Sequence, residues 1–256
     1  MQTMRIGLLM SPAVSDFRKN TLRPILADTT FKVVMALIDD RPEKSAWQRL
    51  KNNLRRGRGG YVIIMAFKRF FASKIPQEDS ENYCDRHGIA VHRTVTPYGE
   101  DTLTKVKASE LDVLVLVDGF GIVKKGLINA VPLGVISYHH GNMRRYRGMP
   151  PAMWELYNGE TEMGITVQLL SVGLDNGRPI IEKTIAIEPN DDVDRLTRRA
   201  LKESERMLYA ALKELVKPGF VAPIIKEFGK VYTLPNLSQW LFLQVRIIKN
   251  KLFKGS

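Results

Sequence analysis

The chain has 256 residues, and its 44% hydrophobic content suffices to bury the core of one ordinary domain with a C-terminal appendage. Its single cysteine, Cys84, excludes an internal disulfide framework and fits a reducing, cytoplasmic compartment, and a chain of this length needs no metal scaffold. The formal net charge of +12 favours anionic partners such as nucleotides, phosphorylated small molecules, RNA or an acidic membrane surface, without choosing among them.

The first part of the chain alternates short apolar runs with amphipathic stretches. Its opening apolar run is too short for a membrane span and lacks a cleavage site after a basic leader, so we interpret it as a strand. Strands are predicted at 5–10, 31–38, 89–93, 111–117 and 134–139, and helices at 14–26, from about 43, at 99–109 and at 124–130. Segment 57–75 fits a buried strand or a helix, and we favour a helix. This alternation predicts an α/β fold with a mostly parallel sheet.

The pattern changes after residue 150. The prolines of PPAMWELYNGE suit a helix N-terminus, and MGITVQLLS and PIIEKTIAI form a predicted hairpin of strands 163–171 and 179–187. Apolar residues at helical spacing predict one long helix over 191–216. A short strand (GKVYTL) and a basic amphipathic helix capped by Asn236 should follow. We therefore expect a main domain over 1–217 and a small C-terminal extension over 218–256.

Two residues stand out as candidates for chemistry. His139 falls at the carboxyl end of the predicted strand GVISYH, where open α/β sheets bind ligands. Asp175 lies in the LDNG turn between the two hairpin strands. Each has a plain structural alternative, since a loop histidine often only donates a hydrogen bond and an aspartate often only shapes a turn.

The residues from 134 to 177 resemble the formyltransferase family, which includes methionyl-tRNA, glycinamide ribonucleotide and sugar-nucleotide N-formyltransferases. The family pattern runs N-x-H-P-S-L-L-P-x-Y-R-G, W-A-x-x-N-G-E, a strand with G-V-T, and G-x-D-T-G. The matching segments here are SYHHGNMRRYRGMPP, WELYNGE, MGITV and GLDNG. Several separated motifs in register are far more specific than any single one. The order and spacing match across about 111–187.

The resemblance implies a Rossmann-like catalytic domain with helices on both faces of the sheet, which binds 10-formyltetrahydrofolate and needs no metal. It places the family's catalytic histidine and aspartate at His139 and Asp175, where the histidine accepts the proton of the attacking amine or stabilises the oxyanion. The aspartate would hold the histidine in orientation. The residues that the resemblance assigns to the folate site are Val117, Phe120, Gly121, Ile122, Gly173 and Leu174.

One departure from the pattern affects the catalytic set. The family's asparagine aligns with Ser137, and the proline after the histidine becomes His140. A serine hydroxyl is shorter than an asparagine amide, and losing one oxyanion donor typically costs about 3 kcal/mol. Asn142, Asn176, His140 or a water on Ser137 are alternative donors. The same substitution leaves open a hydrolase that releases formate, or a folate- or nucleotide-binding protein without turnover.

The leading acceptor is an amine on a small anionic molecule, such as a nucleotide-linked amino sugar. Arg144, Arg145 and Arg147 follow His139 and suit phosphate binding, although solvent exposure or pairing with acids explains them equally well. Asn142 and His140 complete the proposed acceptor site. Aminoacyl-tRNA is the second acceptor: the charge favours it, and the missing C-terminal barrel of the family's RNA-associated members disfavours it.

The basic helix at 236–254 has three readings. Its apolar side chains are Trp240, Leu241, Phe242, Val245, Ile247 and Ile248, with Arg246, Lys249 and Lys251 nearby. It can dock onto the core, join a second copy in a homodimer, or contact an anionic membrane surface. Docking is the favoured interpretation, because ordinary packing helices share this pattern.

Overall fold

A computed structural model describes residues 3–43, 45–56 and 77–253. Its centre is a seven-stranded sheet in the order β10-β9-β7-β6-β1-β3-β5. The strands are β1 (Met4–Met10), β3 (Phe31–Asp39), β5 (Ala90–Thr94), β6 (Val113–Leu116), β7 (Val135–His139), β9 (Glu162–Leu169) and β10 (Arg178–Ala186). Five strands are parallel, and the β9–β10 hairpin extends one edge antiparallel. The predicted α/β fold with a mostly parallel sheet is confirmed.

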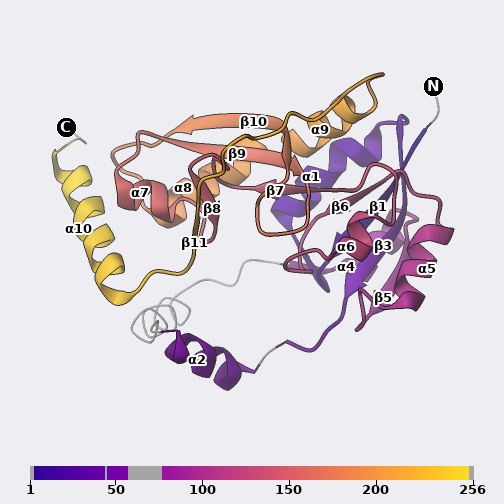
Figure 1. The fold of residues 1–256 in the computed structure, drawn as a ribbon, viewed down its shortest axis with the longest axis horizontal. Coiled ribbons are helices and arrows are strands. Elements are labelled where there is room, and N and C mark those ends of the chain that lie inside the picture. Colours follow the sequence, from indigo (N-terminus) through magenta and orange to yellow (C-terminus); the bar gives the residue numbers. More distant parts are fainter. Residues whose placement is uncertain (1–2, 44, 57–76, 254–256) are drawn as a thin grey trace.

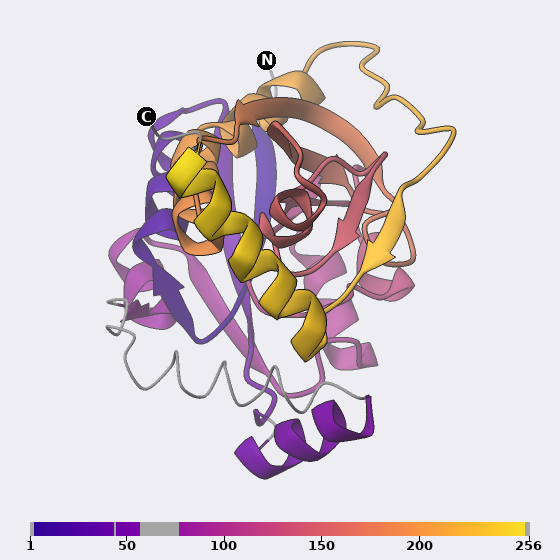
Figure 2. The ribbon, with the colours of Figure 1, turned by 90° about the vertical axis from the view of Figure 1, so that its left-hand side faces the viewer.

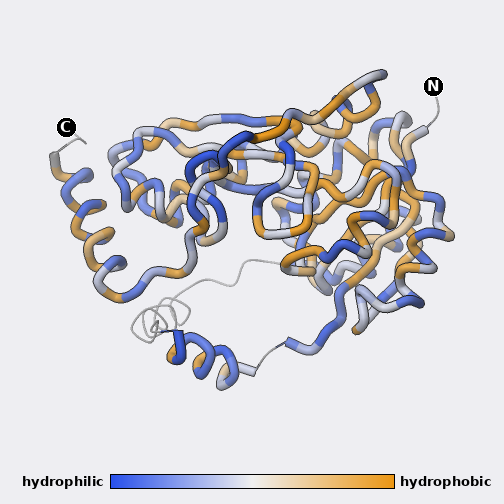
Figure 3. Tube along the Cα trace, in the orientation of Figure 1, coloured by the Kyte–Doolittle hydropathy of each residue, from blue (hydrophilic) through white to orange (hydrophobic). Residues whose placement is uncertain are grey.

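Helices cover both faces of this sheet (Figure 1). The helices of the described residues are α1 (Asp16–Ala27), α2 (Ala46–Arg55), α4 (Ser80–Arg86), α5 (Glu100–Ala108), α6 (Lys125–Ile128), α7 (Met153–Asn158), α8 (Val193–Ser204), α9 (Met207–Leu215) and α10 (Leu237–Phe253), and among them α2 buries no side chain and does not cover the sheet. Successive residues of a strand point to opposite faces. Leu8 of β1 accordingly packs in a core cluster with Leu22 and Leu208, whereas Leu9 packs in a second cluster with Val106. Hydrophobic residues concentrate in this layered body (Figure 3).

The order of the strands indicates at which edge of the sheet a ligand is expected to bind. From β1 the chain builds β3 and β5 on one side, then returns to build β6 and β7 on the other. The direction of winding therefore reverses between β1 and β6. In such sheets ligands bind beyond the carboxyl ends of the strands at this reversal. His139 is the last residue of β7, one strand away from it.

Most predicted elements are present with small shifts of their ends. The hairpin of β9 and β10 and the helices at α1, α2, α5, α6 and α7 are confirmed. The helix favoured for 57–75 lies outside the described residues. Helix α4 and three short strands, β2 (Ala13–Ser15), β4 (Gln77–Asp79) and β8 (Tyr146–Gly148), were not predicted, and β2 pairs with β4.

The single long helix predicted over 191–216 is wrong, because two helices, α8 and α9, occupy this stretch. The hydroxyl of Tyr138 donates a 2.6 Å hydrogen bond to the carbonyl of Ser204 and accepts a 3.0 Å bond from the N–H of Leu208. These two backbone groups would bond to each other in an uninterrupted helix. The Tyr138 side chain from β7 therefore takes the place of one backbone hydrogen bond and divides the segment into two helices.

The C-terminal segment packs against the rest of the chain. Strand β11 (Lys230–Tyr232), which was predicted, pairs in parallel with β8. The predicted cap of α10 is confirmed, because Oδ1 of Asn236 accepts the N–H of Gln239 at 2.9 Å. Helix α10 packs on α7 at the end of the molecule away from α5 (Figure 1). No helix among the described residues is long and apolar enough to cross a membrane. The domain boundary at 217/218 stays a prediction.

Candidate functional site

Four buried polar side chains share one face of the sheet at the β7–β9 pair. Ser137 lies directly opposite Gln168, and His139 lies opposite Thr166. Residues two apart on a strand share a face, and directly paired residues of neighbouring strands do too. Their exposed fractions are 7% for Ser137, 6% for His139, 1% for Thr166 and 1% for Gln168. We call these four residues the polar quartet.

His139 is held at both edges of its ring. Its Nε2 lies 2.8 Å from the carbonyl oxygen of Tyr146, so Nε2 carries a hydrogen and donates it. Its Nδ1 lies 3.5 Å from Oδ2 of Asp175. A Cβ on Gly141 would lie only 2.6 Å from Nε2, so glycine at this position makes room for the ring. The structure thus brings together the two residues that the sequence analysis singled out.

Asp175 is fixed in the loop between β9 and β10. It adopts a left-handed backbone conformation with φ of 44°, which aspartate tolerates better than most residues. Its Oδ2 accepts the N–H of Gly148 at 2.8 Å, and its Oδ1 lies 3.4 Å from Nε2 of Gln168. Oε1 of Gln168 in turn accepts the N–H of Gly177 at 3.1 Å. These contacts aim the carboxylate at His139.

The donors proposed to replace the family's asparagine have other partners. Oδ1 of Asn142 accepts the N–H of Arg144 at 3.0 Å in a local turn. Asn176 donates to the carbonyl of Val172 at 3.1 Å and also accepts a bond from Ser171. The carboxamide that lies beside Ser137 and Asp175 belongs to Gln168, which the sequence analysis missed. Only the pairing of β7 with β9 reveals it, because 31 positions separate it from Ser137 in the chain.

His140 points to the opposite face of the sheet from His139. Its ring stacks on Tyr138 at 5.4 Å, and its Nε2 lies 3.2 Å from Oγ of Ser204. Burial, followed by the nearby Arg18 guanidinium, lowers the pKa of His140 to about 3. This histidine is therefore uncharged at neutral pH and contacts α8 rather than the polar quartet.

The three arginines after His139 have separate environments. Arg144 pairs with Glu182, and Nη2 of Arg145 lies 2.6 Å from Oε1 of Glu160. Arg147 instead donates to backbone carbonyls, from Nε to Gly229 at 2.7 Å and from Nη1 to Leu174 at 3.4 Å. Pairing with acids, one of the alternatives left open, thus holds for the first two. Arg147 is the arginine of this cluster that contacts the loop of Asp175.

The loop after β6, assigned to the folate, has an unusual backbone. Gly119, Phe120 and Gly121 have consecutive φ values of 72°, 57° and 61°. The Phe120 ring and Val117 are buried, while Ile122 is 57% exposed. The hydroxyl of Tyr98 donates to the carbonyls of Phe120 and Ile122 at 3.1 and 3.2 Å, which fixes the loop. A Cβ on Gly121 would meet nothing within 4 Å, so the loop is open to a flat ligand there.

The second segment that the resemblance assigns to the folate is the loop that carries Asp175. Gly173 has a φ of 128°, a conformation that favours glycine, and Leu174 is 37% exposed. The carbonyl of Leu174 accepts the contact from Arg147 described above. Both segments thus offer backbone and apolar surface, which suits a heterocycle.

A small recess beside His139 contains a second group that the sequence analysis missed. Its lining residues are His139, His140, Tyr146, Arg147, Gly148, Pro150, Trp154, Glu155 and Tyr232. Tyr232 of β11 closes it by packing at 4.9 Å from the Trp154 ring. Glu155 is 3% exposed, and burial raises its pKa to about 7. The sequence does contain a hint of this group, because the family pattern W-A-x-x-N-G-E has alanine at the position that Glu155 occupies in this chain.

The raised pKa predicts how stability depends on Glu155. The folded state holds this proton up to about pH 7 and the unfolded chain only to about 4.5, so stability falls as pH rises between these values. We expect Glu155→Gln to raise the free energy of unfolding above pH 7 by up to about 3 kcal/mol, with no gain below pH 4.5. Urea unfolding across this range measures it, with the exposed Glu227→Gln as control. A gain that is equal at both ends would contradict the titration of Glu155.

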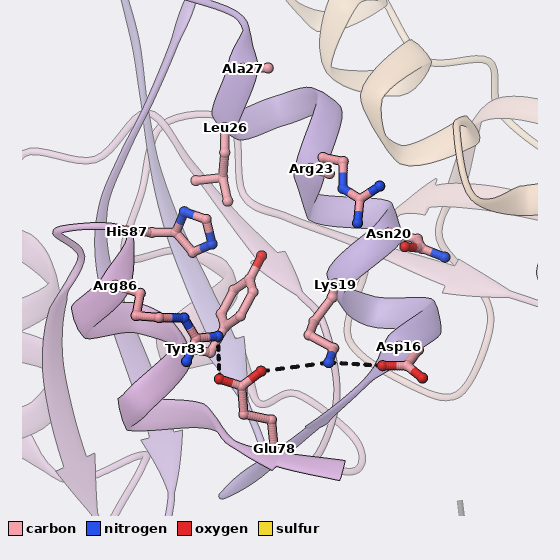
Figure 4. Close-up of a pocket in the computed structure, with 10 residues that line it drawn as sticks. All are labelled: Asp16, Lys19, Asn20, Arg23, Leu26, Ala27, Glu78, Tyr83, Arg86 and His87. Carbon is pink, nitrogen blue, oxygen red and sulfur yellow. Dashed lines mark ion pairs between the residues drawn. The ribbon is translucent and has the colours of Figure 1, made fainter. Parts of the chain in front are cut away.

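A hollow of about 770 Å³ lies elsewhere, between α1 and α4. In Figure 4, Lys19 stands between Asp16 and Glu78, at 2.8 and 3.5 Å, and Arg86 also pairs with Glu78. Its charges are thus largely compensated by one another. Neither His139 nor Asp175 lines it, so it is not the catalytic candidate.

Comparisons with known proteins match a large part of the chain. The model of the formyl transferase family matches residues 41–212. Methionyl-tRNA formyltransferase of Trichlorobacter lovleyi is 34% identical over 154 residues, which are 60% of this chain and 48% of that protein. The corresponding enzyme of Pelobacter propionicus is 35% identical over 111 residues, 43% of this chain and 34% of that protein. The matches thus span less than half the length of these relatives.

Solved structures share the fold at low identity. Glycinamide ribonucleotide transformylase 1 of Symbiobacterium toebii has a TM-score of 0.59 at 18% identity, covering 88% of this chain and 95% of its own. The N-formyltransferase of Helicobacter canadensis, in complex with folinic acid and dTDP-3-aminofucose, has a TM-score of 0.55 at 13% identity, covering 96% and 80%. These likenesses confirm the predicted Rossmann-like architecture.

Proposed function

Since the chain belongs to the formyl transferase family, we propose that it transfers a formyl group from 10-formyltetrahydrofolate to an amine of a small anionic acceptor. The observation that carries this proposal is the pair formed by the buried His139 and the partly buried Asp175, whose Nδ1 and Oδ2 lie 3.5 Å apart. A base beside a carboxylate is what amine acylation requires, because the attacking nitrogen must lose a proton.

The proposed steps follow from the contacts of the pair. 10-Formyltetrahydrofolate supplies the formyl carbon, to which the acceptor nitrogen forms its new bond. His139 and Asp175 take the proton that this nitrogen loses, and they return it to the folate nitrogen as its bond to carbon breaks. The Tyr146 carbonyl anchors Nε2 of His139, so that the Nδ1 edge stays directed at Asp175. No proton is gained or lost over the cycle.

We assign the missing oxyanion donor to Gln168. As the formyl oxygen becomes negative, a donor fixed beforehand stabilises it most effectively. The carboxamide of Gln168 is fully buried, is held through Oε1 by the N–H of Gly177, and lies in register with Ser137. Among the residues that the structure describes, its Nε2 has a single contact, at 3.4 Å to Asp175, so it retains hydrogen-bonding capacity for a substrate oxygen. On this assignment Ser137 makes room beside Gln168 and does not itself act as the donor.

The acceptor class rests on charge and on the fold relatives. The net charge of +12 favours an anionic acceptor, and Arg147 is the cation that contacts the loop of Asp175. A fold relative from Helicobacter canadensis holds dTDP-3-aminofucose. An aminoacyl-tRNA is the second candidate, because the curated relatives are methionyl-tRNA formyltransferases. Hydrolysis is the third, since a formyltetrahydrofolate deformylase shares the fold at 16% identity.

A single-turnover assay tests these alternatives. We expect tetrahydrofolate release from 10-formyltetrahydrofolate to depend on a pool of nucleotide-linked amino sugars, with the formyl group recovered on the sugar. Release that needs methionyl-tRNA and declines steeply as salt rises would instead identify the RNA acceptor. Release of formate without any acceptor would identify a hydrolase. Folate binding with no release under any condition would exclude transfer and leave a binding protein.

A further inference from the structure

Helix α10 leaves a continuous apolar stripe on the surface of the molecule. The five side chains of this stripe are Leu237, Leu241, Val245, Ile248 and Leu252, with exposed fractions of 45%, 51%, 66%, 57% and 67%. Their spacing of four, four, three and four residues places them along one side of the helix. We call these residues the outer stripe.

The opposite side of α10 is the docked side. Leu243 is fully buried and Ile247 is 5% exposed, both in the main core cluster. Arg246 donates a 2.7 Å hydrogen bond to the carbonyl of Tyr157 at the end of α7. The predicted docking onto the core is therefore confirmed for this side. Because docking already anchors the helix, it does not explain the outer stripe.

The charges beside the outer stripe restrict what can cover it. At about 100° per residue, Lys249 and Lys251 fall on opposite flanks of the stripe. Lys251 contacts Asp192 at 3.3 Å, and Lys249 is exposed. The sequence of α10 contains no aspartate or glutamate. An apolar arc with lysines on both flanks suits a surface that is apolar inside and anionic at its boundary.

A second copy of the chain fits the stripe poorly. Two α10 helices packed stripe to stripe in parallel would bring Lys249 and Lys251 towards the same residues of the other copy, and in an antiparallel pair the lysines would face the uncharged first turns of the other helix. Neither helix offers an acid to pair with them, and each copy carries a net charge of +12. The headgroups of anionic lipids, in contrast, attract each lysine near the surface.

Helix α2 provides a second observation in favour of an anionic lipid surface. Among its described residues none is buried, and Trp47 and Leu54 are 71% and 54% exposed. Like α10, it contains basic residues and no acid. In Figure 1 it lies below α10 towards the same end, and in Figure 2 it lies below α10 on the side turned to the viewer. Two exposed basic amphipathic helices thus stand on one side of the molecule.

We propose that the outer stripe of α10 binds in the headgroup region of an anionic bilayer, with the helix axis parallel to the membrane plane. The stripe inserts between lipids while Lys249 and Lys251 contact the phosphates. Because the docked side of α10 packs on α7, binding holds the folded enzyme at the membrane. This attachment is independent of which amine the enzyme formylates.

Sedimentation with vesicles tests the proposal on the full chain. We expect binding to vesicles of equimolar phosphatidylcholine and phosphatidylglycerol, weak binding to phosphatidylcholine alone, and release as ionic strength rises. The double variant Val245→Gln/Ile248→Gln should lower the partition coefficient at least about tenfold, because the inserted apolar area shrinks. Lys249→Gln should lower it by a smaller factor on anionic vesicles only.

Matched controls distinguish binding through the outer stripe from non-specific binding through other exposed apolar side chains. The double variant Val221→Gln/Ile224→Gln makes the same chemical change at two side chains that are each 75% exposed but lie outside α10. Lys226→Gln removes one exposed lysine from the same segment. Both should bind like the parent, and circular dichroism should show all variants folded. No binding to anionic vesicles, or equal loss in the control double variant, would overturn the proposal. So would a dimer in solution that Val245→Gln/Ile248→Gln dissociates, because the stripe would then belong to a second copy.

Discussion

His139→Gln is expected to slow formyl transfer in a single turnover by about a thousandfold, the middle of the range for losing a general acid–base group. Glutamine still donates to the Tyr146 carbonyl that now accepts from Nε2, so the loop contact is preserved. What disappears is the titratable nitrogen that faces Asp175. The substitution therefore tests the loss of proton transfer separately from the loss of the loop contact.

The measurement is the rate of tetrahydrofolate release at saturating 10-formyltetrahydrofolate, together with folate binding by fluorescence. His87→Gln is the matched control, because this exposed histidine lines the hollow between α1 and α4 and not the site. We expect the control to retain the parent rate and both variants to bind folate normally. A rate for His139→Gln within a few-fold of the parent would exclude His139 as the base.

Gln168→Met should lower the same rate by about a hundredfold, because it removes the amide donor while conserving side-chain length. The N–H of Gly177 also loses its partner, so we expect a cost in the free energy of unfolding of about 1–3 kcal/mol. Thermal unfolding measures this cost separately from the rate. An unchanged rate in a folded variant would show that Gln168 is a structural residue.

A rescue experiment distinguishes a donor from a structural amide. Ser137 lies directly opposite Gln168, so Ser137→Asn in the Gln168→Met background returns a carboxamide to the same face of the sheet. We expect it to recover at least about tenfold in rate without restoring the hydrogen bond of Gly177. Ser137→Ala in the same background is the control and should recover nothing. Equal rates in the two double variants would contradict the assignment of Gln168.

The sequence predicted the elements whose cause is local. The runs around β1, β6 and β7 are nearly continuously apolar because both faces of a central parallel strand are covered by helices. His139 could be placed at a strand end for the same reason, since GVISYH ends where the apolar run meets a Gly-rich turn. The prediction of one long helix over 191–216 was wrong because the periodicity of that segment cannot reveal the hydroxyl of Tyr138, which lies far away in the sequence and divides the helix.

By itself the sequence determined the α/β sheet and the hairpin, and the family motifs singled out His139 and Asp175, which the structure brings to within 3.5 Å of each other. Tertiary structure alone decided which carboxamide stands beside Ser137, since the register of β7 and β9 pairs residues far apart in the chain. It also decided that α10 buries Leu243 and exposes Val245. A helical pattern reports how apolar each side of a helix is. Which side meets the core depends on the neighbours that pack against it, and those neighbours are assembled by the whole fold.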